Sequence, residues 1–523
     1  MKQRKINFFV VLLSVACWLT FAYSSPLLST LDNYHVNSLT QYKLIAFTVC
    51  IYTIVLAIAR LANLFKPAAI FFIMVAAPAS FYMLQYGIVI DADMLINAIE
   101  TNPTEALDQF STRFYITVAI MGILPSLLLI YVQMPSATAT KKIKQGLTAA
   151  VCFSLFSIGI AYTNYNEFAS LFRNHRDVKY RIVPFNVVSA SVSVIKQKLK
   201  KPAQFVALGQ DAIQVTSHSK PRVMVVVLGE TARADHFSLN GYQRSTTPML
   251  SELDKSEGLL SYKEAISCGT ATAVSVPCMF SFYNADNYTP SARNSSNVLD
   301  VLETAGINAT WIENNSGCKN VCDRINTVVL KGKDCNKNNC YDTDMLSYLN
   351  DWLNNINQDS VIVLHQLGSH GPAYFERSPE RLKQFFPECR SRDLTECTKD
   401  EIVNAYDNSL LVTDRLISQV VGLLKSHEDL DSSMMYVSDH GESLGDNGIY
   451  LHGLPNWLAP KEQRHIPWVV WPAKRFKSPK NIPQGNINHD NLSHTLLGYF
   501  SVKTSLYNEQ TDLIQQSVNQ PGR

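Results

Sequence analysis

The chain has 523 residues, 46% of them hydrophobic, and a formal net charge of +2. A chain of this length predicts about three domains of ordinary size. The nearly balanced charge argues against a protein that binds nucleic acid. The long apolar runs lie in the first 165 residues, and the remainder has the pattern of a soluble α/β protein.

Five apolar runs in the first part of the chain predict membrane-spanning helices. They are approximately Asn7–Tyr23, Tyr42–Leu64, Pro67–Ile90, Phe114–Val132 and Gly146–Tyr162. Spanning needs about 20 residues and at least about 17, so the first and last runs are short but sufficient. A cleaved signal peptide is the alternative for the first run, but no small-x-small cleavage site follows Tyr23. We therefore expect a transmembrane domain of five helices over residues 1–163.

The positive charges predict the orientation of these helices. Lysines and arginines precede the first run and lie between the second and third and between the fourth and fifth: Lys2, Arg4, Lys5, Arg60, Lys66, Lys141, Lys142 and Lys144. The alternate loops, Ser24–Gln41 and Asp91–Arg113, contain one arginine and no lysine. By the positive-inside rule, the N-terminus is cytoplasmic and everything after about residue 163 lies outside. The protein is thus expected in the inner, cytoplasmic membrane with a periplasmic C-terminal part.

Two further stretches lie near the membrane. Asn97, Thr101 and Glu105 in the second outer loop are spaced by four residues, so on a helix they share one face. That face is either simply solvated or able to hold an ammonium head group. Residues 164–221 mix cationic and apolar positions, which predicts a connector with an amphipathic helix on the membrane surface.

The cysteines support the same topology. Cys17, Cys50 and Cys152 lie inside apolar runs, where a thiol behaves as a small hydrophobic group. The other eight form close-spaced couples in the soluble part: Cys268 and Cys278, Cys318 and Cys322, Cys335 and Cys340, Cys389 and Cys397. Four local disulfides in an oxidising compartment are the favoured interpretation. A structural zinc site is the alternative for the two middle couples.

Residues 222–523 alternate short apolar runs with helical patterns, which predicts a mainly parallel sheet with helices on both faces. Four runs end in polar residues: Val223–Leu228 before Glu230, Ala309–Ile312 before Asn315, Val361–Leu364 before His365 and His370, and Met434–Val437 before Asp439 and His440. Ligands of open α/β sheets bind beyond the carboxyl ends of the strands. These residues are therefore expected at one rim of the sheet.

The segment Ser267–Cys278 consists of small and hydroxylated residues between two cysteines. It predicts an exposed loop that a Cys268–Cys278 bridge would hold, either as a stabilised surface loop or as the carrier of a nucleophilic hydroxyl. Thr270, Thr272 and Ser275 are the candidate nucleophiles.

Glu230, Asp439 and His440 offer the oxygen and nitrogen ligands that catalytic zinc sites use. Three protein ligands leave one coordination position open, which a hydroxyl such as that of Thr272 would fill. His370 and His452 are candidates for binding a phosphate or a second metal ion.

Four long motifs resemble those of the phosphoethanolamine transferases that modify lipid A, a family that includes the transferable colistin-resistance enzymes and belongs to the alkaline phosphatase-like superfamily. They are Gly229–His236, Ser267–Cys278, His365–Tyr374 and Ser438–Gly445. The resemblance covers nearly the whole chain and implies an α/β periplasmic domain of the alkaline phosphatase/sulfatase type. It implies Thr272 as nucleophile, with zinc bound by Glu230, Thr272, Asp439 and His440. It also implies head-group or second-metal contacts at Asn97, Thr101, Glu105, Asn315, Lys319, His370 and His452. The pairings Cys268–Cys278 and Cys389–Cys397 are implied too, whereas Cys318–Cys322 is absent from some relatives.

The resemblance implies an enzyme that transfers phosphoethanolamine from phosphatidylethanolamine to lipid A or its core sugars. The reaction would pass through a covalent phosphoethanolamine-threonine, and the enzyme would be a monomer. A phosphoglycerol transferase of the lipoteichoic acid synthase type is one alternative, but the cysteines and the Asn97/Thr101/Glu105 face argue against it. A sulfatase is disfavoured because its Cys-x-Pro-x-Arg signature is absent. The alternative that is not an enzyme is a non-catalytic membrane sensor or scaffold.

Overall fold

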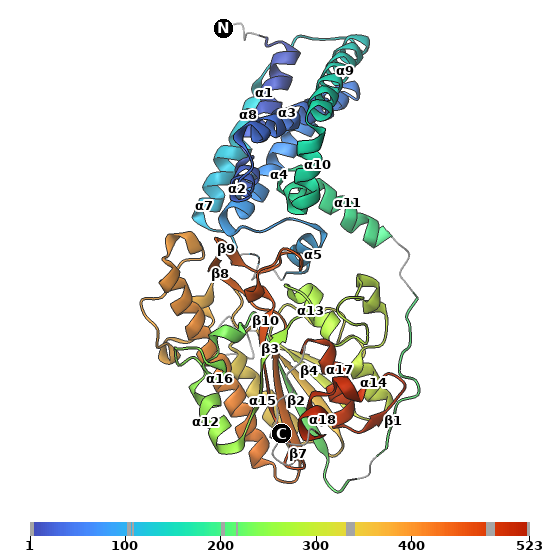
Figure 1. The fold of residues 1–523 in the computed structure, drawn as a ribbon, viewed down its shortest axis with the longest axis vertical. Coiled ribbons are helices and arrows are strands. Elements are labelled where there is room, and N and C mark those ends of the chain that lie inside the picture. Colours follow the sequence, from blue (N-terminus) through green and yellow to red (C-terminus); the bar gives the residue numbers. More distant parts are fainter. Residues whose placement is uncertain are drawn as a thin grey trace. The chain divides into compact units, whose positions relative to one another are not determined.

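The computed structural model describes residues 5–101, 106, 109–199, 204–215, 218–330, 340–476 and 487–519. The chain divides into two compact units, whose elements are labelled in Figure 1. The first unit contains Met1–Leu95 and Phe110–Leu199, and the second contains Ile96–Gln109 and Lys200–Arg523. The segment Ile96–Gln109, which carries Asn97 and Thr101, therefore belongs with the larger, C-terminal unit.

The first unit is helical. Its elements are α1 (Phe8–Phe21), α2 (Ser25–Asn33), α3 (Ser38–Leu61), α4 (Phe65–Tyr86), α7 (Thr112–Thr117), η1 (Val118–Ile123), α8 (Leu124–Tyr131), α9 (Ala139–Thr163), α10 (Tyr165–Asn174), η2 (Arg176–Arg181) and α11 (Phe185–Leu199). Helix α5 (Ala92–Glu100) contains residues of both units. Within the described residues, four helices are long and apolar enough to cross a membrane: α3, α4, Thr112–Tyr131 and α9. Helices α1 and α2 meet the same requirement as a pair bent by 46°, so the described chain has four candidate spans, or five if this pair is one span.

Apolar packing holds the helical unit together. Leu12, Leu56 and Ile73, from α1, α3 and α4, belong to one buried cluster and are at most 2% exposed. Other apolar side chains of the same unit point outward, and Leu128 and Ile158 are 59% and 64% exposed. Helices with apolar residues on their outer as well as their inner faces are expected where the surrounding medium is lipid.

The second unit is built on a seven-stranded sheet with the order β3-β10-β7-β2-β6-β4-β5. The strands are β2 (Arg222–Gly229), β3 (Leu260–Ile266), β4 (Asn308–Glu313), β5 (Asn326–Val329), β6 (Ser360–His365), β7 (Asp431–Ser438) and β10 (His465–Trp471). The pairs β7-β2, β2-β6, β6-β4 and β4-β5 are parallel, whereas β10 is antiparallel to both of its neighbours. The mainly parallel sheet is thus confirmed, and all four predicted runs are strands.

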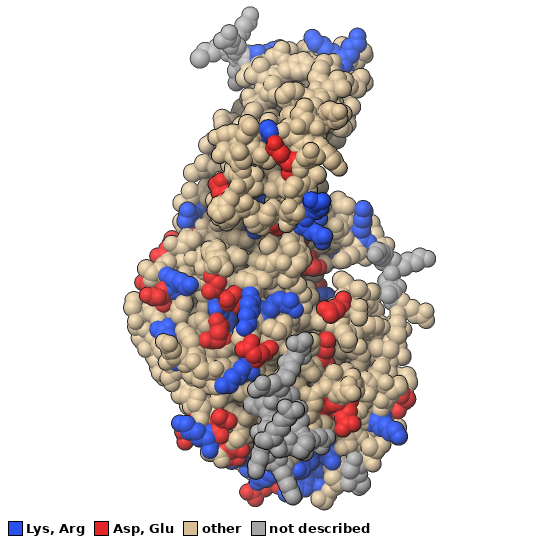
Figure 2. All heavy atoms as spheres, viewed as in Figure 1, with Lys and Arg blue, Asp and Glu red and all other residues tan. Residues whose placement is uncertain are grey.

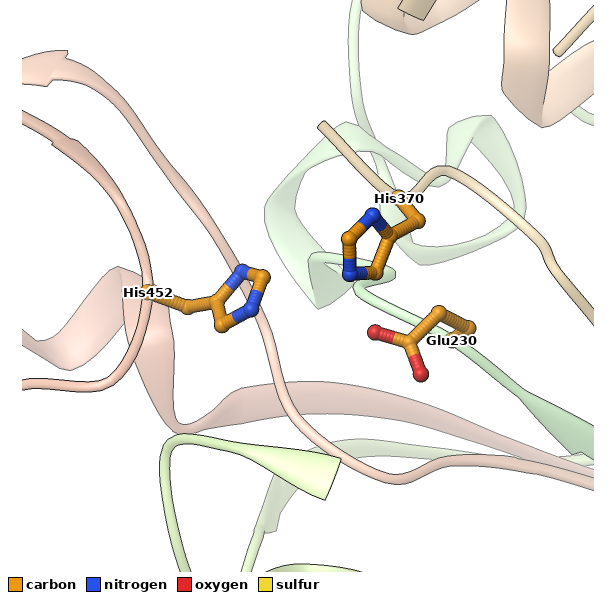
Figure 3. A group of neighbouring side chains, drawn as sticks. All are labelled: Glu230, His370 and His452. Atoms are coloured by element: carbon orange, nitrogen blue, oxygen red, sulfur yellow. The ribbon is translucent and has the colours of Figure 1, made fainter. Parts of the chain in front are cut away.

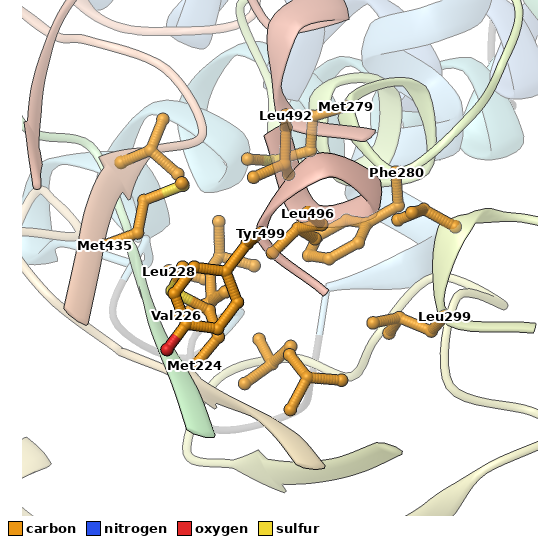
Figure 4. Close-up of a cluster of buried hydrophobic side chains, with 14 of the residues drawn as sticks. Met224, Val226, Leu228, Met279, Phe280, Leu299, Met435, Leu492, Leu496 and Tyr499 are labelled. Atoms are coloured by element: carbon orange, nitrogen blue, oxygen red, sulfur yellow. The ribbon is translucent and has the colours of Figure 1, made fainter. Parts of the chain in front are cut away.

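Helices cover both faces of this sheet. All eight residues of β2 are buried. Met224, Val226 and Leu228 belong to a cluster with side chains from α13 (Thr272–Met279), α14 (Val298–Thr304) and α17 (Asp490–Tyr499), and Figure 4 shows part of it. Helix α16 (Lys399–Ser426) contacts β2, β7 and α12 (Pro248–Glu257). A strand buried on both faces is apolar throughout, which explains why the run at Val223–Leu228 shows no alternation.

Buried apolar side chains run along α16 from Ile402 to Leu424. The helix begins at a capping box, in which the hydroxyl of Thr398 accepts from the Glu401 N–H and the Glu401 carboxylate accepts from the Thr398 N–H. Shorter elements complete the unit: β1 (Ile213–Gln214), β8 (Ser443–Asp446), β9 (Ile449–Leu451), β11 (Val502–Lys503), α15 (Met345–Leu353), α18 (Leu513–Asn519), and the 3-10 turns Ala234–His236, Ser238–Asn240, Pro290–Asn294, Asp342–Asp344, Tyr374–Glu376, Glu380–Leu382, Leu394–Glu396, Lys461–Gln463 and Glu509–Thr511.

Three of the predicted disulfides are present: Cys268–Cys278, Cys318–Cys322 and Cys389–Cys397. Cys335, the predicted partner of Cys340, lies outside the described residues. Cys17, Cys50 and Cys152 in the helical unit are free thiols, in agreement with their assignment as small apolar side chains.

Candidate active site

The carboxyl ends of the parallel strands bring the predicted polar residues to one rim of the sheet. Gly229 at the end of β2 is in register with Ser438 at the end of β7, so Glu230 and Asp439 follow neighbouring strands at the same level. On the other side of β2, Leu228 is in register with His365, which is in turn in register with Glu313 of β4. Parallel register therefore brings together residues that are up to about two hundred positions apart in the sequence.

The segment Ser267–Cys278 differs from its prediction, because it is not an exposed loop. Thr272 begins helix α13, and the residue is only 5% exposed. The small residues of this segment allow its backbone to pack closely against the rim of the sheet. The segment is therefore buried although it has no bulky side chains. The structure also separates the three candidate hydroxyls. Thr270 Oγ1 donates to the carbonyl of Leu454 at 2.6 Å, and Ser275 Oγ accepts from Gly269 N at 3.0 Å.

The hydroxyl of Thr272 faces charged groups. Its Oγ1 donates to Glu230 Oε2 at 2.9 Å and lies 3.4 Å from His440 Nε2. The other ring nitrogen of His440, Nδ1, lies 2.8 Å from the carbonyl of Gly441 and donates to it. This hydrogen bond fixes the tautomer, so Nε2 is the atom that is available as a ligand.

Glu230, Asp439 and His440 form a buried group whose ligand atoms all lie within 4.8 Å of one another. Burial raises the pKa of Asp439, and the charge of Glu230 raises it further. Burial also acts to raise the pKa of Glu230, but its interactions with His440, His370 and His452 together outweigh burial and lower it. Burial acts to lower the pKa of His440, but Asp439 and Glu230 raise it above its ordinary value. Two carboxylates therefore share this buried space with one adjacent imidazole.

These residues fit a divalent cation. Asp439 Oδ2 is buried, and within the described residues no hydrogen-bond donor reaches it. Nε2 of His440 lies 3.4 Å from this oxygen and 3.3 Å from Glu230 Oε1. A buried carboxylate oxygen without a donor is costly unless a cation binds it. Two oxygens and one imidazole nitrogen are typical ligands of catalytic zinc.

A second group shares Glu230. The ligand atoms of Glu230, His370 and His452 also lie within 4.8 Å of one another, and Figure 3 shows both imidazoles beside the Glu230 carboxylate. His452 Nδ1 lies 3.3 Å from Glu442 Oε1, and the Tyr374 hydroxyl donates to Glu442 Oε2 at 3.0 Å. The buried Glu442 therefore orients His452.

The remaining predicted contacts are placed as follows. Asn315 Nδ2 donates to Glu230 Oε2 and to the carbonyl of Gln366, both at 2.8 Å, so Asn315 supports Glu230 directly. Lys319 Nζ donates to the carbonyls of Ser316 at 2.9 Å and Glu100 at 3.2 Å. Thr101 Oγ1 donates to the carbonyl of Asn97 at 2.8 Å. Glu105 lies outside the described residues.

The backbone around Glu230 has unusual geometry. Thr231 has φ 61°, which is unfavourable for a β-branched residue and is held here by a hydrogen bond from its N–H to Asp439 Oδ1 at 3.2 Å. A Cβ atom on Gly368 would lie 2.6 Å from the carbonyl oxygen of Glu230. Glycine at position 368 therefore allows the loop that follows β6 to pack directly over Glu230.

Sequence reasoning missed several residues that build this site. Glu442 follows His440 by two positions and was detectable within the same motif. Asp342, Arg293 and His489 lie outside every motif. Arg293 pairs with Glu100 at 3.2 Å and donates to the carbonyl of Ala273, next to Thr272. His489 Nδ1 accepts from the Cys268 N–H at 3.1 Å, and its Nε2 donates to the Ser438 carbonyl at 3.0 Å, which links the Thr272 segment to the end of β7.

Comparison with known proteins agrees with this geometry. Residues 222–502 match the family model described as Sulfatase, and residues 48–199 match the model described as Phosphoethanolamine transferase EptA/EptB. Phosphatidylethanolamine transferase Mcr-1 of Escherichia coli is 36% identical to the chain over 98% of both proteins. The chain belongs to the phosphoethanolamine transferase family.

Solved structures of the phosphoethanolamine transferase family extend the match to the whole fold. The integral membrane protein lipooligosaccharide phosphoethanolamine transferase A (EptA) of Neisseria meningitidis is 30% identical and superimposes with a TM-score of 0.93, covering 98% of this chain and 99% of that one. The C-terminal periplasmic domain of phosphoethanolamine transferase EptC of Campylobacter jejuni is 40% identical, with a TM-score of 0.55, and covers 61% of this chain and all of that one. The predicted membrane location with a periplasmic C-terminal domain is thereby confirmed.

Proposed function

We propose that this protein transfers phosphoethanolamine from phosphatidylethanolamine to lipid A or its core sugars, through a covalent phosphoethanolamine-Thr272 intermediate. The observation that carries the proposal is the buried Thr272 hydroxyl at 2.9 Å from Glu230 Oε2 and 3.4 Å from His440 Nε2. The name of the Mcr-1 relative supports phosphatidylethanolamine as donor, and that of the Neisseria protein supports a lipooligosaccharide acceptor.

The reaction has two displacements. Thr272 Oγ1 attacks the phosphorus of the donor, and the bond from phosphorus to the diacylglycerol oxygen breaks. A phosphate or sugar hydroxyl of the acceptor then attacks the same phosphorus, and Thr272 leaves. Thr272 lies in the first turn of α13, where the partial positive charge of the helix N-terminus favours a phosphoryl group.

Glu230, Asp439 and His440 would hold a zinc ion, which when bound supplies the Lewis acidity that a threonine hydroxyl needs to act as a nucleophile near neutral pH. Thr272 Oγ1, which donates to Glu230 Oε2 at 2.9 Å, would complete this set of ligands. Glu230 is kept in place by Asn315, and His440 is oriented by the Gly441 carbonyl.

His370 and His452 also lie beside Glu230, with the His452 ring 4.4 Å from the His440 ring, and they are suited to binding the phosphoryl oxygens or a second metal ion. Either imidazole can protonate the departing diacylglycerol oxygen. Asn97, Thr101 and Glu105 would hold the ethanolamine ammonium group. Lys319 would offset negative charge on the phosphoryl oxygens once substrate replaces its backbone contacts.

The same proposal covers the organisation of the chain. We infer five membrane crossings, with the bent pair α1–α2 as the first, because an odd number is needed to place a cytoplasmic N-terminus and a periplasmic catalytic domain on opposite sides. Residues 1–163 would form the membrane domain, residues 164–221 a membrane-surface connector, and residues 222–523 the catalytic domain. The enzyme would act as a monomer.

Intact-protein mass spectrometry after incubation with phosphatidylethanolamine tests the covalent step. The parent protein should carry one phosphoethanolamine group, and Thr272→Ala should carry none. Thr270→Ala is the matched control from the same segment, and it should keep the adduct because the Thr270 hydroxyl binds a backbone carbonyl. An adduct that persists in Thr272→Ala would refute the assignment of the nucleophile.

Metal analysis and lipid analysis test the other two parts. The purified protein should contain zinc, and Asp439→Asn should contain less. A protein without zinc would favour a non-catalytic sensor or scaffold. Mass spectrometry of lipid A from cells with and without the gene should show phosphoethanolamine on lipid A or its core sugars only when the gene is present.

A further inference from the structure

The helical unit contains a cavity of about 690 Å³ that the proposed reaction does not use. It lies where the connection between α3 and α4 approaches the connection between α8 and α9. Its walls include Lys5, Arg60, Lys66 and Lys142, together with residues 130–137. Arg60, Lys66 and Lys142 lie at the helix ends that flank these connections, and they are among the cations that place this end of the unit in the cytoplasm.

The positive charge of this cavity is not balanced by nearby acids. Four cationic side chains line it, and no Asp or Glu is among its described lining residues. The sequence contains one carboxylate, Asp32, between residues 5 and 90, and none between residues 110 and 166. Figure 2 shows Lys and Arg side chains at the upper end of this unit, whereas its Asp and Glu side chains lie lower.

Neutral groups hold these cations in place. Lys66 Nζ donates to the carbonyls of Ile130 at 2.9 Å and Val132 at 2.8 Å. Lys142 Nζ donates to Asn63 Oδ1 at 2.8 Å. These contacts fix the positions of the ammonium groups without neutralising their charge, so an anion gains a preorganised site.

Arg60 is an independent indication of a ligand. Its residue is only 6% exposed, and the guanidinium lies 4.7 Å from the centre of the Phe8 ring. One terminal nitrogen donates to Gln145 Oε1 at 3.2 Å, but Nε is buried and no acceptor among the described residues reaches it. A buried arginine that lines a cavity and keeps an unpaired N–H is unfavourable unless an acceptor occupies that cavity.

We propose that this cavity binds the head group of an anionic phospholipid from the cytoplasmic leaflet. A phosphodiester supplies the negative charge and the several acceptor oxygens that Arg60, Lys66 and Lys142 lack. Basic pockets between transmembrane helices on the cytoplasmic side suit such head groups. The site is independent of the transferase reaction, because its cations lie at the cytoplasmic end of the helical unit and the reaction is proposed on the periplasmic side.

Native mass spectrometry of the full-length protein in a neutral detergent tests this site. Phosphatidylglycerol should bind with one-to-one stoichiometry at concentrations where phosphatidylcholine does not, and inorganic phosphate should not displace it. Each cation near an anionic lipid contributes about a fivefold factor in affinity, so Lys66→Gln with Lys142→Gln should weaken binding roughly 25-fold.

Lys141→Gln with Lys144→Gln is the matched control. It removes the same charge from the start of α9, which also carries Lys142, but neither lysine lines the cavity and both are exposed. Binding in this control should change by less than about threefold. Because Lys66 also holds two backbone carbonyls, Lys5→Gln with Lys142→Gln serves as a second cavity variant. Equal weakening in cavity and control variants, or equal binding of phosphatidylcholine, would overturn the proposal.

Discussion

Asp342 offers the sharpest test of how the active site is supported. Asp342 is 6% exposed, and its carboxylate accepts four hydrogen bonds from two loops of the site. Oδ1 accepts from Asn314 Nδ2 at 2.7 Å and Leu367 N at 2.8 Å. Oδ2 accepts from Gly368 N at 2.9 Å and Gln366 Nε2 at 3.3 Å. One side chain therefore fixes the loop that leads to Asn315 and the loop that leads to His370.

Asp342→Asn keeps the shape of this side chain but replaces one acceptor oxygen by an NH₂ group. In either orientation of the amide, two of the four donors then face another donor. Each buried donor left without an acceptor costs about 1–3 kcal/mol, so we expect a loss of roughly 3 kcal/mol in the free energy of unfolding. For a domain of this size, that corresponds to a decrease in Tm of about 6 °C.

Thermal unfolding of the full-length protein in detergent measures this effect, and diacylglycerol release from phosphatidylethanolamine measures activity. We expect kcat/KM to fall at least about tenfold, because a small displacement of positioned groups is costly for catalysis. Asp351→Asn, at an exposed position of α15, is the control and should change neither quantity. An Asp342→Asn protein with unchanged Tm, or one that is destabilised but fully active, would refute the reasoning.

Three further substitutions probe other contacts. Burial lowers the pKa of His489 from 6.5 to about 4, so the unfolded state binds a proton where the folded state does not, and stability falls by about 3 kcal/mol as the pH decreases through this range. His489→Gln should flatten the stability profile measured by chemical denaturation between pH 7 and 4, and an unchanged slope would contradict the assignment. Arg293→Gln should raise KM at least about threefold, because Arg293 contacts the carbonyl of Ala273 next to Thr272, and it should change Tm little, because its ion pair with Glu100 is partly exposed. Arg324→Gln is the control, since Arg324 pairs with Asp300, and it should leave KM unchanged. Leu228→Ala in the fully buried β2 should lower the free energy of unfolding, measured with denaturant, by about 3–5 kcal/mol. A decrease below about 1 kcal/mol would contradict the packing of Leu228 in the core.

The chemistry of the site could be predicted from the sequence because each ligand is joined to a recognisable local pattern. An apolar run followed directly by Glu230 or by Asp439 and His440 indicates a strand that ends at a rim. Parallel register then requires neighbouring rim residues to approach one another, whatever their separation in the chain. The prediction failed for the segment around Thr272, because small residues are compatible both with an exposed loop and with a tightly packed helix start.

By itself, the sequence determined the membrane runs, the orientation of the chain, the parallel sheet and the donor types of the metal group, since all of these follow from local composition and periodicity. Tertiary structure alone decided which hydroxyl faces Glu230, and that Asp342, Arg293 and His489 hold the surrounding segments. The physical reason is that such contacts join residues far apart in the chain, and a buried carboxylate or imidazole acquires its role only from the donors and acceptors that folding places around it.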